Sequence, residues 1–271
     1  MPSTVTRRAF VATLVSSAGC AALDVNRAHA AASGQSASAA PDPGLIPDLV
    51  AGNHILVRKG VIQINGHLSA RHTANKNRFF LARAIAPETV AAADIMEFDL
   101  DSNAIDARGR TAYTERFIHS EIYKARPDVM AVVHAHTPSV LPFATSDIPL
   151  RPVYQLATFI GESVPVYKNG DRGEVVANVE QARELVRVLG NGAVALMHGH
   201  GEVVVAPSVR TVVSRCIELE LNARILQNIL AMGGKPVYLR PAPPAAQQGG
   251  GGGFSRDWDA WIQEEKRLIG R

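Results

Sequence analysis

The chain has 271 residues, of which 46% are hydrophobic and 20% charged, and its formal net charge is +3. These values are ordinary for a globular protein, and the length is enough for one domain with a sizeable core. Part of the positive charge lies in the amino-terminal segment, and the body of the chain has no basic cluster interleaved with aromatic residues. The composition therefore gives no reason to expect nucleic acid as a partner.

Residues 1–30 are predicted to be an export signal rather than part of the fold. Arg7 and Arg8 precede a mildly apolar run at 11–23, and residues 28–30 (Ala-His-Ala) offer a cleavage site. The arginine pair resembles a twin-arginine signal, which predicts a periplasmic or otherwise exported protein. An arginine pair in an ordinary secretory signal is the alternative. The run is too short and too weakly apolar to span a bilayer, so we expect no membrane insertion of the mature chain.

The next elements follow from composition and periodicity. Residues 31–46, rich in Ala, Ser and Pro, are predicted to be a disordered lead. A helix is expected over Leu45–Arg58, and Gly60 ends it. We expect a strand to begin within 61–64, followed by the turn signal Asn65-Gly66.

A further strand is expected at 95–100, with an acidic turn after it. Asp99, Asp101 and Asn103 have the spacing of the first calcium-loop ligands, but the glycine and the terminal glutamate of such a loop are missing. A plain acidic turn is therefore the favoured interpretation.

One helix–strand unit carries most of the functional argument. Apolar residues at helical spacing predict a helix over 114–125, which Pro127 ends. The run 130–133 predicts a buried strand that leads into His134 and His136. Because side chains alternate along a strand, these two imidazoles point to one face and can reach one metal ion.

A second apolar run, residues 194–197, precedes His198 and His200, and we expect these two histidines to share a face as well. Between the two histidine stretches lie a predicted strand at 164–167 and a predicted helix over Val179–Leu189. Three histidines on two strand ends make a three-nitrogen site with open positions, which is typical of catalytic divalent metals. Packed core histidines are the alternative interpretation.

The carboxyl-terminal part contains one long and one short predicted helix. The long helix runs from 208 to Met232 and contains Cys216, the only cysteine left after signal cleavage, so no intramolecular disulfide is expected. Residues 241–253 are predicted to be a Pro/Gly-rich linker. Residues 254–271 are predicted to form an amphipathic helix whose tryptophans dock on the chain's own core or on a neighbouring subunit.

Together these motifs resemble the class II aldolase/adducin family. Its members carry an acidic residue before a helix, an H-x-H pair about one helix and one turn later, and a third histidine before a glycine. On this resemblance, Glu115 is the catalytic acid/base. His134, His136 and His200 would hold one divalent ion per subunit, which is Zn, Mn or Fe. His198 falls where the family often has a non-ligand.

The resemblance also predicts the architecture. It covers roughly residues 47–239, most of the mature chain and nearly all of the predicted domain at 47–240, and implies an α/β fold, a class II aldolase-like α/β/α sandwich with a largely antiparallel central sheet. Members of the family are often homotetramers with active sites at subunit interfaces, so a homo-oligomer is expected.

The segments that bind phosphate in the sugar-phosphate aldolases of this family differ here. His67 replaces an Asn, Arg83 lies in a segment that lacks the family's Gly, and Tyr113 precedes the acidic residue where serines are usual. A phosphate cradle needs small residues, whereas arginine fits a carboxylate and rings suit a flat substrate. With Ser69 and Tyr154 from neighbouring motifs, these residues are predicted to bind a small-molecule carboxylate. The alternative is that Arg83 is a surface residue.

The motifs most resemble the branch of the family that decarboxylates hydroxylated aromatic or pyridine dicarboxylates. The leading interpretation is a divalent-metal-dependent carbon–carbon lyase, a decarboxylase of a hydroxylated aromatic or heteroaromatic carboxylate. A class II aldolase on a non-phosphorylated substrate and a three-histidine iron oxygenase on the same fold are the alternatives. A non-catalytic adducin-type module is disfavoured because the histidines and Glu115 are retained.

Overall fold

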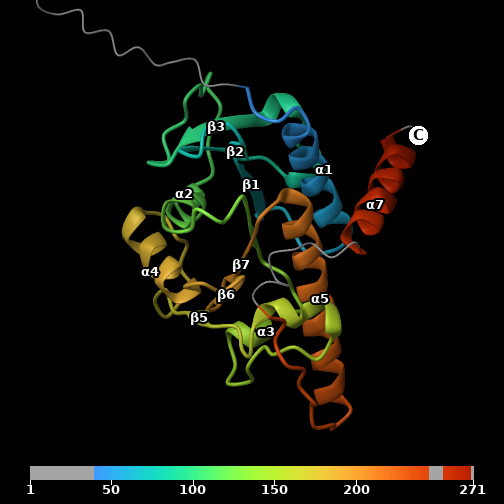
Figure 1. The fold of residues 1–271 in the computed structure, drawn as a ribbon. Coiled ribbons are helices and arrows are strands. Elements are labelled where there is room, and N and C mark those ends of the chain that lie inside the picture. The colour runs from blue at the N-terminus through green and yellow to red at the C-terminus, as the bar shows by residue number, and fades with distance from the viewer. Residues whose placement is uncertain (1–39, 244–252, 270–271) are drawn as a thin grey trace, which may run out of the picture. The chain divides into compact units, whose positions relative to one another are not determined.

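The computed structural model describes residues 40–243 and 253–269. The predicted export signal, the predicted lead up to residue 39 and most of the predicted linker lie outside these residues. Within the described part, the strands form one seven-stranded sheet in the order β3-β2-β1-β4-β7-β6-β5 (Figure 1). The strands are β1 His67–Arg71, β2 Arg78–Ala82, β3 Ile95–Asp99, β4 Ala131–Ala135, β5 Val166–Tyr167, β6 Val194–Met197 and β7 Gly201–Ala206.

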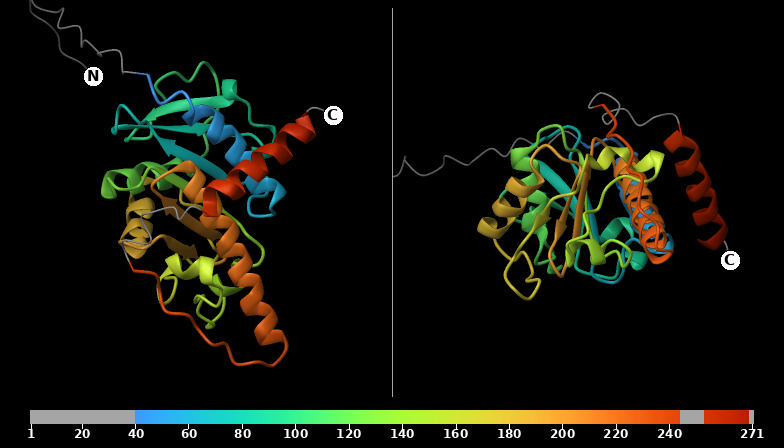
Figure 2. Two further views of the ribbon diagram at one scale, coloured as in Figure 1. Left: turned by 45° about the vertical axis from the view of Figure 1, so that its right-hand side comes forward. Right: turned by 90° about the horizontal axis from the view of Figure 1, so that it is seen from below.

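The sheet is the middle layer of three. Neighbouring strands run antiparallel, apart from the parallel pair β5 and β6. One face is covered by α1 and α5, the other by α2 and α4, and the layers are separate when the fold is seen from below (Figure 2). The predicted α/β/α sandwich with a largely antiparallel sheet is therefore confirmed. The helices are α1 Leu45–Arg58, α2 Arg116–Ala125, α3 Leu141–Ala144, α4 Val179–Leu189, α5 Val209–Ala231 and α7 Gly253–Ile269, with short 3-10 turns η1 Pro87–Thr89, η2 Ala92–Asp94 and η3 Gln155–Ile160.

Two hydrophobic cores fill the spaces on either side of the sheet. In the central strand β4, Ala131 and Val133 belong to the core beneath α1 and α5, while Val132 belongs to the core beneath α2 and α4. This alternation is the period-two pattern of a strand buried on both faces. His134 continues it and so points to the α2/α4 side, where the candidate site lies.

The predicted elements largely match the structure, with corrections at the start of the chain. Helices α1 and α4 have the predicted bounds. The predicted strand within 61–64 is wrong, because the backbone N–H groups of Val61 and Ile62 donate to the Leu56 carbonyl at the end of α1. Sheet pairing begins only at His67. Helix α1 starts at Leu45, so residues 45–46 of the predicted lead belong to the fold.

Helix α7 lies against α1 and α5 of its own chain. Trp258 is buried in the core beneath it, and the guanidinium of Arg210 lies 5.3 Å from the Trp258 ring centre. Glu265 of α7 pairs with His54 and Arg58 of α1. Of the two predicted docking modes, the structure shows the one on the chain's own core. None of the helices in the described residues has the length and apolar character needed to cross a membrane.

Candidate metal centre

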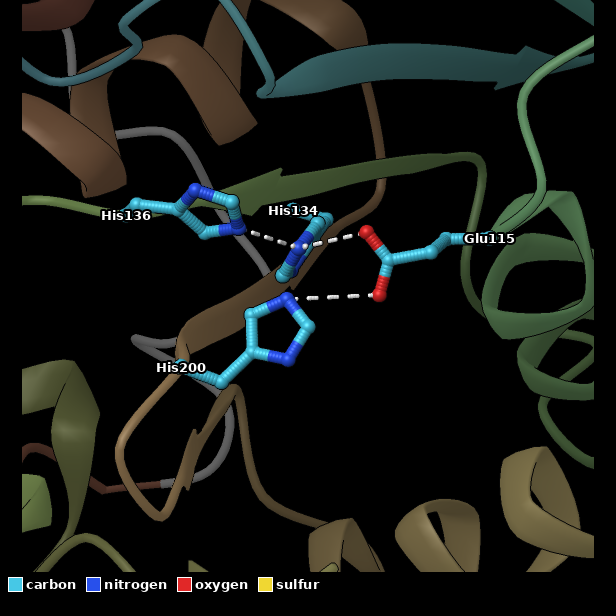
Figure 3. Close-up of side chains that lie close together, drawn as sticks. All are labelled: Glu115, His134, His136 and His200. Atoms are coloured by element: carbon cyan, nitrogen blue, oxygen red, sulfur yellow. Dashed lines mark hydrogen bonds and ion pairs between the residues drawn. The ribbon is translucent and has the colours of Figure 1, made fainter. Parts of the chain in front are cut away.

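Four side chains from three parts of the chain meet at one end of the sheet (Figure 3). Glu115 stands at the start of α2, His134 is in β4, His136 follows β4, and His200 lies in the turn between β6 and β7. Each offers a ligand atom, and these atoms lie within 4.8 Å of one another. The Nε2 atoms of His134 and His136 are 3.0 Å apart, and the Glu115 carboxylate lies 3.2 Å from His134 Nε2 and 3.4 Å from His200 Nε2.

Strand pairing and two glycines explain how His200 reaches the pair on β4. Strands β4 and β7 pair in register with Ala135 opposite Glu202. Gly199 adopts φ +64°, a conformation that favours glycine and permits the tight reversal before β7. At Gly201, a β-carbon would lie only 2.1 Å from the Ala135 carbonyl oxygen. The glycines on either side of His200 therefore allow the β6–β7 turn to approach β4 closely.

Hydrogen bonds behind two of the histidines set their tautomers. His134 Nδ1 lies 3.0 Å from the Glu202 carbonyl oxygen, and His200 Nδ1 lies 3.1 Å from the Glu174 carbonyl oxygen. A carbonyl oxygen only accepts, so Nδ1 carries the proton in both rings. The Nε2 lone pairs consequently point into the cluster, which is how backbone carbonyls orient metal-binding histidines.

The electrostatics of the cluster also suit a cation. Burial alone would raise the pKa of Glu115, but His134, His200 and His67 outweigh it and hold that pKa far below its ordinary value. Burial, with the charges of His134 and His200, lowers the pKa of His136 to about 3, so this imidazole is neutral near pH 7. Imidazole nitrogens and a carboxylate that converge on one point are a donor set that fits a divalent metal.

The family model of the class II aldolase and adducin N-terminal domain matches residues 47–227. The chain belongs to the class II aldolase and adducin family. It is 31% identical to the decarboxylase tropJ of Talaromyces stipitatus over 82% of this chain and 95% of the relative. It is also 31% identical to the 3,4-dihydroxyphthalate decarboxylase of Arthrobacter keyseri, over 79% of this chain and 90% of the relative.

Among solved structures, an aldolase II superfamily protein from Pseudomonas syringae superposes with a TM-score of 0.68 at 24% identity. The match covers 84% of this chain and 95% of the other. At this identity the likeness shows the fold alone, and it agrees with the class II aldolase architecture described above.

Two of the predicted substrate residues, His67 and Tyr113, lie beside the cluster of Glu115 and the three histidines. In the pairing of β1 with β4, His67 is directly opposite His134. The His67 ring lies 4.6 Å from the Tyr113 ring, centre to centre, and its Nε2 is 3.9 Å from the Glu115 carboxylate. Ser69 shares this face of β1, but it is fully buried and its hydroxyl contacts His119 and not the cluster.

The structure does not bring the other two predicted substrate residues to the cluster. Arg83 follows β2 and pairs with Asp94, with 2.6 Å between Nε and Oδ1 and 40% of its side chain exposed. Tyr154 lies near α5, where its backbone N–H donates to the Asn222 side chain. Helix α5 covers the face of the sheet opposite to α2. Substrate binding by Arg83 and Tyr154 therefore stays a prediction.

The expectation that His198 and His200 share a strand face is wrong. Strand β6 ends at Met197, and both histidines lie in the turn that reverses the chain. The backbone N–H of His198 donates to the Tyr167 carbonyl, and its side chain is not part of the cluster. This agrees with its place as a non-ligand in the family pattern.

Sequence reasoning missed the loop between β5 and α4. Its Val176 N–H donates to Glu115 Oε1 at 3.3 Å, and its Glu174 carbonyl accepts from His200. The contact is close, because a β-carbon on Gly173 would lie 2.5 Å from the Gly199 carbonyl oxygen. The two glycines of this loop were the available signal, since they mark a tight turn after a strand.

Proposed function

We propose that this protein is a divalent-metal-dependent decarboxylase of a hydroxylated aromatic carboxylate. The observation that carries the proposal is the convergence of His134, His136, His200 and Glu115 at one end of the sheet. The similarity to two named decarboxylases over about four-fifths of the chain supports the reaction type. The small-molecule carboxylate is the substrate class that both the relatives' names and the loss of the phosphate-loop pattern favour.

The four residues divide into two roles in this proposal. The three histidines hold the metal, which when bound supplies Lewis acidity to neighbouring oxygen atoms of the substrate. Glu115 moves the proton. It is buried, its carboxylate lies 3.2–3.4 Å from two ligand nitrogens, and it is ionised near pH 7 because its pKa is far below the ordinary value.

The proton balance of decarboxylation needs one such group. The bond between the ring carbon and its carboxylate breaks, CO₂ leaves, and the ring carbon takes up a proton. Glu115 accepts the proton of the ring hydroxyl next to that bond and returns it to the ring carbon, so the ring product is formed as a phenolate, which takes up one proton from solvent. Val176 N–H, on the side of Oε1, keeps the carboxylate directed at the cluster.

The test is a substrate screen with the reaction type resolved by its products. The purified chain is stripped of metal, reloaded with Zn, Mn or Fe, and supplied with hydroxylated benzoates and phthalates. We expect CO₂ and the ring product with one carboxylate fewer in equal amounts, without oxygen uptake, and much less of both with Glu115→Gln. Oxygen uptake coupled to turnover would instead favour the oxygenase, an aldehyde product the aldolase, and neither result is compatible with the proposal.

A further inference from the structure

Behind Glu115, four buried polar side chains form one hydrogen-bonded row. Tyr123 Oη lies 2.7 Å from Ser69 Oγ, and Ser69 Oγ lies 2.6 Å from His119 Nδ1. The other nitrogen of His119, Nε2, lies 2.7 Å from His67 Nδ1. All four residues are at most 1% exposed. The members of the row alternate between α2, with Tyr123 and His119, and β1, with Ser69 and His67, and the row ends beside the Glu115 carboxylate.

Each member of the row has a single proton to give, so the direction of one hydrogen bond sets the direction of all. Burial raises the pKa of Tyr123, and burial together with the charges of His67 and His134 lowers the pKa of His119 well below its ordinary value. The phenol therefore keeps its proton, and the His119 imidazole is neutral.

The Tyr123 hydroxyl, at one end of the row, determines which partner donates in each hydrogen bond. Among the residues that the structure describes, Ser69 Oγ is the one hydrogen-bond partner of the Tyr123 hydroxyl. Tyr123 must donate there, because a buried hydroxyl proton without an acceptor is costly. Ser69 then donates to His119 Nδ1, so the proton of His119 is on Nε2 and is donated to His67 Nδ1. The proton of His67 is thereby left on Nε2.

That last nitrogen faces Glu115. His67 Nε2 is buried, has no hydrogen-bond partner in the described part of the chain, and lies 3.9 Å from Glu115 Oε2. The Nε2 atoms of His134 and His200 are the nitrogens that would bind the metal, so in the metal-loaded protein they supply no N–H to this carboxylate. The Val176 N–H donates a hydrogen bond of 3.3 Å to Glu115 Oε1. An N–H at His67 Nε2 is thus the complementary donor on the side of Oε2.

We propose that the row Tyr123–Ser69–His119 fixes His67 as its Nε2–H tautomer, and that His67 is the positioning residue for Glu115. Its effect on catalysis rests on the proposed function, because it acts through the acid/base role of Glu115. Val176 N–H holds Oε1 by a hydrogen bond, and the Nε2–H dipole of His67, 3.9 Å from Oε2, attracts the carboxylate without a hydrogen bond, so together they favour one orientation toward the metal-binding histidines. The opposite tautomer would direct a lone pair at Oε2 and repel it.

The tautomers are measured directly by long-range ¹H–¹⁵N correlation spectra of the ¹⁵N-histidine-labelled full chain, metal-free and loaded with Zn. His67→Gln and His119→Gln identify the two signal sets. We expect both residues as Nε2–H tautomers. Finding either as the Nδ1–H tautomer overturns the proposal. This readout needs no substrate, so a correct tautomer result together with no CO₂ release would leave the row established and the proposed function rejected.

A matched pair of variants tests the positioning role. In His119→Gln the amide accepts from Ser69 and donates to His67, so the His67 tautomer and most of kcat are retained. In His119→Glu the carboxylate only accepts, so His67 must place its proton on Nδ1. We expect kcat to fall about 10- to 100-fold with KM and metal content unchanged, the range typical of lost supporting contacts at metal sites.

Ser69→Ala tests the same link if His119→Glu does not fold. It removes the acceptor of Tyr123 and the donor to His119, so the His67 signal should become a mixture of tautomers and kcat should fall about tenfold. A residue with a merely structural role would lower the melting temperature without changing the tautomer. Equal kcat in His119→Gln and His119→Glu, or an unchanged His67 tautomer in Ser69→Ala, contradicts the proposal.

Discussion

Gly201→Ala is the substitution that most sharply tests how the fold builds the metal centre. The added β-carbon would lie 2.1 Å from the Ala135 carbonyl oxygen and 2.8 Å from the His136 ring, whereas ordinary contact begins at 3.4 Å. The first neighbour is backbone of the central strand β4, so no side chain can rotate away to make room. Strands β4 and β7 must separate, and His200 moves away from His134 and His136.

The size of the effect follows from this overlap. Overpacking in a protein core typically costs about 1–3 kcal/mol, and we expect the upper end here because a backbone atom is displaced. A misplaced ligand should also weaken metal binding by roughly 10- to 100-fold, the range found when supporting contacts of metal ligands are lost. The assay is a metal titration of the stripped chain against a chromophoric chelator, together with urea unfolding of the metal-free protein.

Gly52→Ala is the matched control. Its β-carbon would lie 2.6 Å from Leu68 Cδ2 and 3.2 Å from Val213 Cγ2, so it disturbs the packing of α1 through side chains on the face of the sheet opposite to the cluster. It should lower the free energy of unfolding but leave metal affinity within about twofold, since distant sites act independently. If Gly201→Ala binds metal as tightly as Gly52→Ala does, the close approach of β4 and β7 is not what assembles the site.

Three further outcomes are expected. Glu115→Gln should lower kcat by roughly 10²–10⁴ and retain the metal, because the amide keeps the shape of the side chain but takes up no proton; loss of the metal in this variant would assign Glu115 as a ligand. His134→Ala should remove the metal and His198→Ala should retain it, as checked by elemental analysis; equal metal contents would refute the ligand set. Burial raises the pKa of Glu202 from 4.5 to about 8, so the folded state holds this proton more tightly than the unfolded chain does. The contribution of Glu202 to the free energy of unfolding of the metal-free chain should therefore fall as pH rises from about 5 to 8, and it is measured as the difference between the unsubstituted chain and Glu202→Gln in urea titrations at each pH.

The parts of the site that the sequence predicts are those set by local periodicity. His134 and His136 follow from the alternation of side chains after an apolar run, and the structure places their Nε2 atoms 3.0 Å apart. Glu115 and His200 needed the family resemblance, because spacing alone does not show that the start of α2 and the β6–β7 turn meet the end of β4. These contacts depend on the order of strands in the sheet. That order places β7 beside β4, although 65 residues separate the two strands along the chain.

The parts that were missed depend on contacts between distant segments. Substrate binding by Arg83 stays a prediction, and what the sequence did not show is its pairing with Asp94, whose approach depends on the η2 turn before β3. The predicted strand within 61–64 had the right residue types, yet Ile64 is 73% exposed and the segment closes the end of α1 instead. His119 lies one turn after Glu115, but its spacing along the helix does not show which residue of the neighbouring strand it contacts. The structure resolves this by bringing it within hydrogen-bonding distance of Ser69.

We propose that the histidine cluster holds a metal on which decarboxylation depends. The direct measurement is the rate of CO₂ release while the metal-free chain is titrated with the activating divalent ion, at a saturating concentration of a hydroxyaromatic carboxylate identified in the screen. The rate should start near zero, rise linearly and level off at one ion per chain, and His200→Ala should show no such rise. A metal-free chain that already releases CO₂ at the full rate would contradict the claim.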